Sequence, residues 1–126
     1  MKKEIIVSAA APRAIGPYSQ AVRSGDLVFV SGQLGLDPQT GKLVSGGVEA
    51  ETKQAIQNLK AIVESAGGTL SAVVKTTVLL ADMNDFTKVN AIYADFFNTD
   101  PPARAAYQVA ALPLGGQIEI EAIAII

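Results

Sequence analysis

The residue best suited to chemistry is an arginine that stands among alanines, directly after two prolines. The stretch Pro101 to Val109 reads PPARAAYQV, and its two prolines exclude a helix because each lacks an N–H donor and has a fixed φ. The alternation that follows predicts a strand with Arg104, Ala106, Gln108 and Ala110 on one face. Alanines leave space beside a guanidinium, whose planar fork suits a carboxylate. The stretch therefore indicates a carboxylate receiver, and a surface arginine paired with an acidic neighbour is the alternative.

Two residue types that carry much enzyme chemistry are missing from the chain. The 126 residues include no histidine and no cysteine. The commonest general base, the commonest metal ligand and any thiol nucleophile are therefore excluded. Ser31 has no histidine to activate it as a nucleophile. Any chemistry must rely on carboxylates, arginine, hydroxyls, backbone groups or water, and we expect neither a metal nor a cofactor.

Composition favours a single domain that associates with copies of itself. A chain of 126 residues suits one compact domain over residues 1–126. Apolar residues make up 49%, which is more apolar surface than a small monomer easily buries. The net charge is −2 and no basic stripe is visible, so nucleic acid is not an expected partner. The first residues lack the apolar run of a signal peptide and no stretch is long enough to span a membrane, so we expect a cytoplasmic protein.

The elements that position these residues can be read from hydrophobic periodicity. An edge strand is predicted over 4–8, an extended segment over 19–23 and a strand over 27–31. Gly32, at the end of this strand, lets the backbone approach another group closely. A helix over 48–66 has one apolar stripe and stops at two glycines. A strand over 72–81, a helix over 85–97, a strand from residue 104 and a strand over 117–126 complete the chain.

This order, β-β-α-β-α-β-β, predicts a two-layer α+β domain. Two helices cover only one face of the sheet, and the other face still carries Val, Leu, Ile and Ala. We expect that free face to pack against copies of the chain. Asn90 lies on the apolar stripe of the second helix and needs a polar partner, which a nearby loop carbonyl would satisfy.

Six short motifs, in order and over nearly the whole chain, resemble those of one family. They are AIGPYSQ at 14–20, VSGQ at 30–33, VKTTV at 74–78, VNAIY at 89–93, PAR at 102–104 and IEIEA at 118–122. Together they resemble the RidA family of reactive intermediate deaminases, formerly called YjgF and also described as endoribonuclease L-PSP or translation inhibitor. The resemblance implies a chorismate-mutase-like fold, a homotrimer with ligand clefts between subunits, and hydrolysis of 2-aminoacrylate, 2-iminopropanoate and 2-iminobutanoate to 2-oxo acids and ammonia. It also implies a functional link to the PLP-dependent dehydratases that form such imines.

The resemblance also assigns roles to individual residues of this chain. Arg104 matches the arginine that holds the substrate carboxylate, and Glu119 matches the carboxylate that positions water; these two are the implied catalytic residues. Five further residues match positions that line or hold the substrate: Tyr18, Ser31, Gly32, Asn90 and Ala106.

Two of these assignments have structural alternatives, and one position departs from the family pattern. Glu119 would otherwise form a salt bridge to Lys75 on a neighbouring strand, and Tyr18 would otherwise be a core ring with a satisfied hydroxyl. Ala106 stands where family members often have cysteine. The resemblance implies that backbone groups carry the role at this position, and alanine keeps them, so we expect activity without the thiol and exclude thiol-dependent chemistry.

These residues are compatible with three functions. An imine deaminase is favoured because an iminium carbon is already an electrophile, so the protein only has to fix the acid and aim a water. A binding or regulatory protein for 2-oxo acids is the first alternative, and ammonia release separates the two. An endoribonuclease, as the older family label suggests, is disfavoured because the chain has no histidine and its net charge is negative.

Overall fold

The computed structural model describes residues 2–126. They form six strands and two α-helices: β1 (Lys3–Ile6), β2 (Ala21–Ser24), β3 (Leu27–Leu34), α1 (Gly47–Ser65), β4 (Val73–Leu80), α2 (Phe86–Phe96), β5 (Ala103–Gln108) and β6 (Ile118–Ile125). The strands make one sheet in the order β1-β2-β3-β6-β4-β5. β4 and β5 are parallel, as their connection through α2 requires, and the other neighbours are antiparallel. The α+β class is confirmed, although the sheet has one strand more than the predicted order counted.

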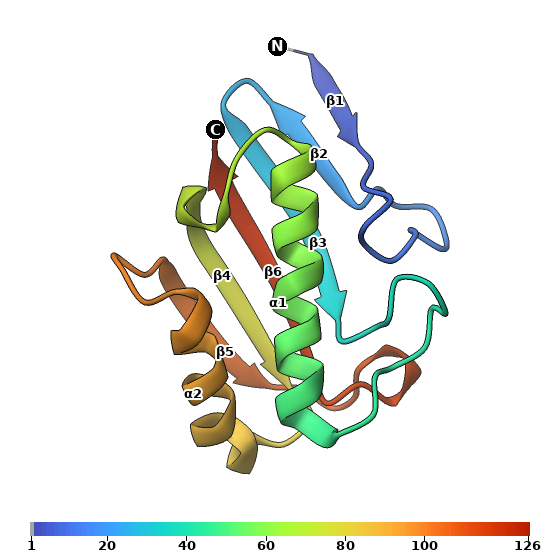
Figure 1. The fold of residues 1–126 in the computed structure, drawn as a ribbon, viewed down its shortest axis with the longest axis vertical. Coiled ribbons are helices and arrows are strands. Elements are labelled where there is room, and N and C mark those ends of the chain that lie inside the picture. Colours follow the sequence, from blue (N-terminus) through green and yellow to red (C-terminus); the bar gives the residue numbers. More distant parts are fainter. Residues whose placement is uncertain (1) are drawn as a thin grey trace.

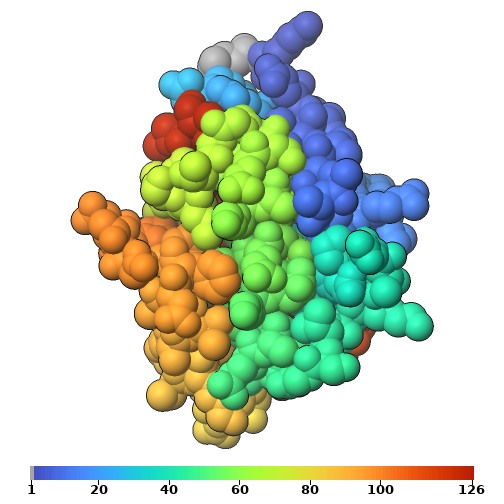
Figure 2. All heavy atoms as spheres, in the orientation of Figure 1, coloured from blue at the N-terminus to red at the C-terminus, as the bar shows by residue number. Residues whose placement is uncertain are grey.

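Both helices lie on the same face of the sheet (Figure 1) and cover it side by side (Figure 2). The predicted stripe of α1 is fully buried: Val48, Thr52, Ala55, Ile56, Leu59, Ile62, Val63 and Ala66. The sheet meets it with the buried face of β6, formed by Ile118, Ile120, Ala122 and Ala124. α1 ends at Ser65, and as predicted the chain turns away two residues later at Gly67, whose positive φ of 99° glycine adopts without strain.

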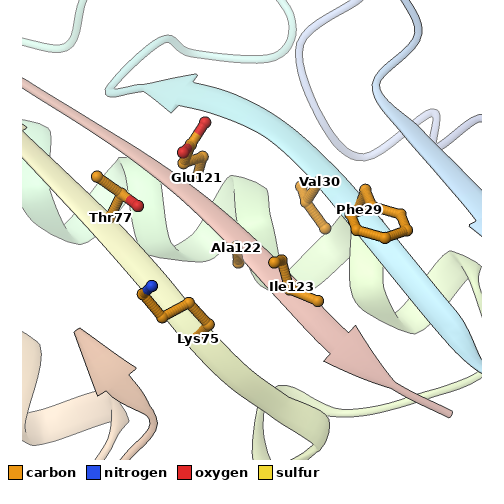
Figure 3. Close-up of a pocket in the computed structure, with 7 residues that line it drawn as sticks. All are labelled: Phe29, Val30, Lys75, Thr77, Glu121, Ala122 and Ile123. Carbon is orange, nitrogen blue, oxygen red and sulfur yellow. The ribbon is translucent and has the colours of Figure 1, made fainter. Parts of the chain in front are cut away.

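The opposite face of the sheet is open within one chain. Alternation along β6 puts Glu119, Glu121, Ile123 and Ile125 on it. A hollow on this face is lined from β3, β4 and β6 by Phe29, Val30, Lys75, Thr77, Glu121, Ala122 and Ile123 (Figure 3). Phe29 is 45% exposed and Ile125 51% exposed, so this face carries apolar surface that one chain leaves in water. No helix within residues 2–126 has the length and apolar character that a bilayer crossing requires.

Candidate functional site

Arg104 is held at the edge of the sheet by side chains of α2. Strand β5 places it beside Thr76 of β4 and on the helix face of the sheet. Its Nη1 donates a hydrogen bond to Asn90 Oδ1 at 2.8 Å. The guanidinium carbon lies 4.8 Å from the centre of the Tyr93 ring and 5.2 Å from that of Phe86. The partner of Arg104 is therefore a neutral amide with two aromatic rings and not an acidic neighbour, and Asn90 is satisfied by Arg104 instead of a loop carbonyl.

A buried pair of hydroxyls lies behind the arginine. The Tyr93 hydroxyl and Thr76 Oγ1 are 2.7 Å apart, and both residues are buried. Burial raises the pKa of Tyr93, while the hydrogen bond to Thr76 and the charge of Arg104 act in the opposite direction. The phenol is therefore neutral at pH 7, and its ring has a fixed position against which the guanidinium lies.

Replacing Tyr93 by phenylalanine should lower the free energy of unfolding by about 1–3 kcal/mol, because Thr76 Oγ1 loses its partner in the core. The aromatic face beside Arg104 is kept. Urea unfolding measures the change. Tyr107→Phe, which alters a hydroxyl on a ring that is 57% exposed, is the matched control and should leave the midpoint unchanged. Equal midpoints for Tyr93→Phe and the natural chain would contradict this assignment.

A second group of predicted site residues lies at the meeting point of β3 and β6. The register of the β3–β6 pair shifts between Val30 and Gln33, so Ser31 and Gly32 lie in the irregular segment. Ser31 Oγ donates to Ser19 O at 2.6 Å, which ties the segment to the loop before β2. A Cβ on Gly32 would lie 2.7 Å from Cδ of Glu119. The close approach predicted at Gly32 is confirmed, and the group that approaches is the Glu119 carboxyl.

Glu119 is half-buried on the open face of the sheet. Burial raises the pKa of its carboxyl above the ordinary value, and the negative charge of Glu121 raises it further. The register puts Glu119 opposite Leu79 and Lys75 opposite Ile123. Four residues along a strand span about 13 Å, so the alternative salt bridge between Glu119 and Lys75 is wrong.

The remaining two predicted residues are Tyr18, in the loop before β2, and Ala106, on β5. Tyr18 is 53% exposed in the loop before β2, so the alternative of a core ring is wrong. Its hydroxyl accepts a long hydrogen bond of 3.4 Å from the Ile15 N–H. Ala106 is half-buried on β5, two residues beyond Arg104 and opposite Val78.

One chain does not bring all of these residues together. Arg104, Asn90 and Ala106 belong to β5 and α2 on the helix side of the sheet. Ser31, Gly32 and Glu119 belong to the β3–β6 junction, where the Glu119 side chain points to the open side. Arg104 and Glu119 are thus on opposite faces, with two strand spacings and three residues of strand length between them, roughly 10 Å in each direction.

Three residues around Arg104 were not predicted as site residues from the sequence. Phe86 lies in the predicted helix over 85–97, and Tyr93 and Thr76 lie within the VNAIY and VKTTV motifs, but none of the three was given a role. The available signal was helical spacing, since Phe86, Asn90 and Tyr93 follow one another at intervals of four and three residues and so share one face of α2. An amide between two aromatic rings on one helix face is a suitable surface for a guanidinium.

Fold and geometry together define a two-layer α+β protein with a preformed arginine site at a sheet edge. Residues 8–126 match the family model described as Endoribonuclease L-PSP. The chain belongs to this family, whose members include reactive intermediate deaminases of the RidA type.

Relatives and solved structures resemble the chain over nearly its whole length. A human 2-iminobutanoate/2-iminopropanoate deaminase is 58% identical over 98% of this chain and 90% of its own. RidA from an Antarctic Psychrobacter species is 49% identical, with a TM-score of 0.94 over 98% of this chain and 99% of the other. TdcF from E. coli, solved with bound serine, is 42% identical, with a TM-score of 0.94 over 98% of both chains. The fold is therefore chorismate-mutase-like, as the resemblance implied.

Proposed function

We propose that this protein is an enzyme that hydrolyses reactive 2-imino and enamine acids, such as 2-aminoacrylate with its imine 2-iminopropanoate, and 2-iminobutanoate, to 2-oxo acids and ammonia. The observation that carries the proposal is the Arg104 site. Asn90 occupies one of the five N–H donors of the guanidinium, and two rings fix its plane. A pre-positioned fork of this kind suits the carboxylate that every 2-imino acid carries. The 58% identity to a human deaminase of this specificity supports the same substrate class.

The chemistry needs little more than positioning and proton transfer. Water attacks C2 of the protonated imine, and the electrons of the C=N bond move to nitrogen. The resulting carbinolamine transfers its hydroxyl proton to the amine, the C–N bond breaks with its electrons leaving on ammonia, and the C=O bond forms. Because the carbon is already electrophilic, neither a histidine nor a cysteine is required.

The proposed roles follow the two groups of residues. Arg104 binds the substrate carboxylate, Asn90 orients the guanidinium, and backbone groups near Ala106 hold the imine nitrogen. Glu119 orients the water and accepts its proton, with Gly32 giving the carboxyl room. Ser31 and Tyr18 form the wall of the pocket on the same side as Glu119.

We infer that a second copy of the chain completes the site, since Arg104 and Glu119 of one chain face away from each other. The exposed apolar face over β3, β4 and β6 gives the reason to associate, and the family resemblance favours a homotrimer with clefts between protomers.

Light scattering at micromolar concentration should therefore report a closed oligomer, with a mass of three chains and no monomer. The physical reason is the apolar open face, which only association removes from water. Phe29→Glu, which puts a charge on a side chain that lines the hollow of that face, should shift the mass toward the monomer (Figure 3). A stable monomer of the natural chain would contradict the shared site.

The direct test supplies the substrate from serine or threonine with a PLP-dependent dehydratase, the class of enzyme that we propose as the functional partner. With the dehydratase in excess, hydrolysis of the imine is the slow step. The protein should then accelerate ammonia release in proportion to its concentration. If the release rate is unchanged while 2-oxobutanoate still binds, the protein is a binding protein and the proposal is wrong. A cytoplasmic location, where such dehydratases act on free amino acids, completes the proposal.

The rate should fall as the pH falls through the raised pKa of Glu119, because a proton acceptor must be ionised. Glu121→Gln removes the smaller of the two causes of that shift and should move the acid limb of the rate profile to lower pH. Burial still holds the limb above that of an ordinary glutamate. The measurement is the deamination rate against pH with excess dehydratase at every point. An acid limb that does not move in Glu121→Gln would contradict the role of Glu119.

A further inference from the structure

A buried carboxylate that the proposed mechanism does not use lies in the first turns of α1. Glu51 is only 4% exposed, on the buried face of α1. Both of its oxygens accept hydrogen bonds from a single residue: Oε1 from the backbone N–H of Gln117 at 2.8 Å, and Oε2 from the Gln117 side-chain amide at 3.1 Å. Two hydrogen bonds from one residue to one carboxylate fix both the position and the orientation of Gln117.

Gln117 lies directly before β6 and two residues before Glu119. The Gln117 carbonyl accepts a hydrogen bond from the Ala81 N–H at 3.0 Å, so Gln117 is held from α1 on one side and from the end of β4 on the other. The residues ahead of it form a tight turn in which Leu114 has a positive φ of 59°. Glu51 and the Ala81 N–H together therefore hold the residue at which the chain passes from this turn into β6.

The same turn of α1 also fixes the end of β3. Gly35 packs so closely on Glu51 that a Cβ there would lie 2.5 Å from Glu51 Cα. β3 carries Gly32, against which the Glu119 carboxyl lies. The backbone of α1 at Glu51 therefore lies against the residue that follows β3, while the Glu51 carboxylate holds the residue that precedes β6.

We infer that Glu51 is a positioning residue for Glu119, because its buried carboxylate fixes Gln117 at the start of β6 and so sets where the Glu119 carboxyl lies. The inference rests on the proposed function, in which Glu119 acts on the water. Glu51 itself touches neither substrate nor water in this account, and its effect is on the rate and not on carboxylate binding at Arg104.

The test compares variants by two readouts: the rate of ammonia release with excess dehydratase, and the dissociation constant of 2-oxobutanoate, which reports on Arg104. Glu51→Ala removes both acceptors and leaves the Gln117 backbone N–H and side-chain amide without their partner. It should lower the rate roughly 10- to 100-fold with little change in 2-oxobutanoate binding. Glu51→Gln keeps a two-point contact, because its oxygen accepts from the Gln117 N–H and its amide N–H donates to the Gln117 side-chain oxygen once that side chain turns over. It should keep most of the rate that Glu51→Ala loses.

Two controls separate the possible failures. Thr52→Ala removes a buried hydroxyl on the same helix, bonded to Val48 O at 2.6 Å, and should lower stability without lowering the rate. An unchanged rate in Glu51→Ala, an equal loss in Glu51→Gln, or an equal loss in Thr52→Ala would each overturn the positioning role. The rate of Glu119→Gln is measured in parallel. If Glu119→Gln keeps the full rate, the proposed role of Glu119 is wrong, and this result is distinct from one that overturns only the positioning role of Glu51.

Discussion

Arg104→Ala is expected to lower the deamination rate roughly 10³-fold, because the substrate carboxylate loses its fixed charged partner. The fold should survive, since Arg104 is exposed at an edge strand and its lost contacts with two rings are worth only about 0.5–1 kcal/mol. The measurements are ammonia release with excess dehydratase and the dissociation constant of 2-oxobutanoate, which should rise together with the loss of rate.

Two further variants sharpen this result. Arg104→Lys keeps the charge but not the planar fork, so it should retain only part of the rate. Lys88→Ala removes a cation from the exposed side of α2, close in sequence to Asn90, and should leave the rate unchanged. Full turnover in Arg104→Ala would refute the role of the guanidinium as carboxylate anchor.

Glu119→Gln is expected to lower the rate by roughly 10²–10⁴-fold, because the amide has nearly the same shape but accepts no proton. Binding of 2-oxobutanoate should persist, since Arg104 belongs to the other group of residues. Glu121→Gln, two residues along the same open face, should keep the rate above the acid limb and serves as the control. A rate in Glu119→Gln equal to that of the natural chain would remove the proposed proton acceptor.

Gly32→Ala tests the same carboxyl without changing it. The added Cβ would lie 2.7 Å from Glu119 Cδ and 2.8 Å from Oε1, so the flexible end of the side chain has to move. The rate should fall while the unfolding midpoint changes little. Loss of stability with an unchanged rate would instead make Gly32 a purely structural glycine.

Periodicity predicted most of the fold because the helices and the last strand have one-sided burial. All eight predicted stripe residues of α1 are buried, and every second residue of β6 from Ile118 to Ala124 is as well. The N-terminal strands were harder to count, because β1 and β2 have four residues each and little alternation. β3 extends to Leu34, beyond the predicted end at Ser31, because an irregular segment hides its pairing with β6.

The site was only partly predictable for a different reason. The residue types around Arg104 and Gly32 indicated a guanidinium site and a close approach. Which groups lie beside them depends on register and on helix packing, and the sequence does not show either. The contacts of Glu51 show this limit: helical spacing from Val48 and Ala55 puts it on the buried face of α1, but its partner, Gln117, lies 66 residues away.

We propose that Arg104 of one copy and Glu119 of another serve one active site, so oligomers that mix two inactive variants should regain activity. Arg104→Ala and Glu119→Gln chains, each inactive alone, are refolded together at equal amounts. In a random mixture about a quarter of the sites combine an intact Arg104 with an intact Glu119 from a different chain. Deamination should therefore return to about that share of the natural activity. Mixed oligomers, verified by a tag on one variant, that remain inactive would contradict it.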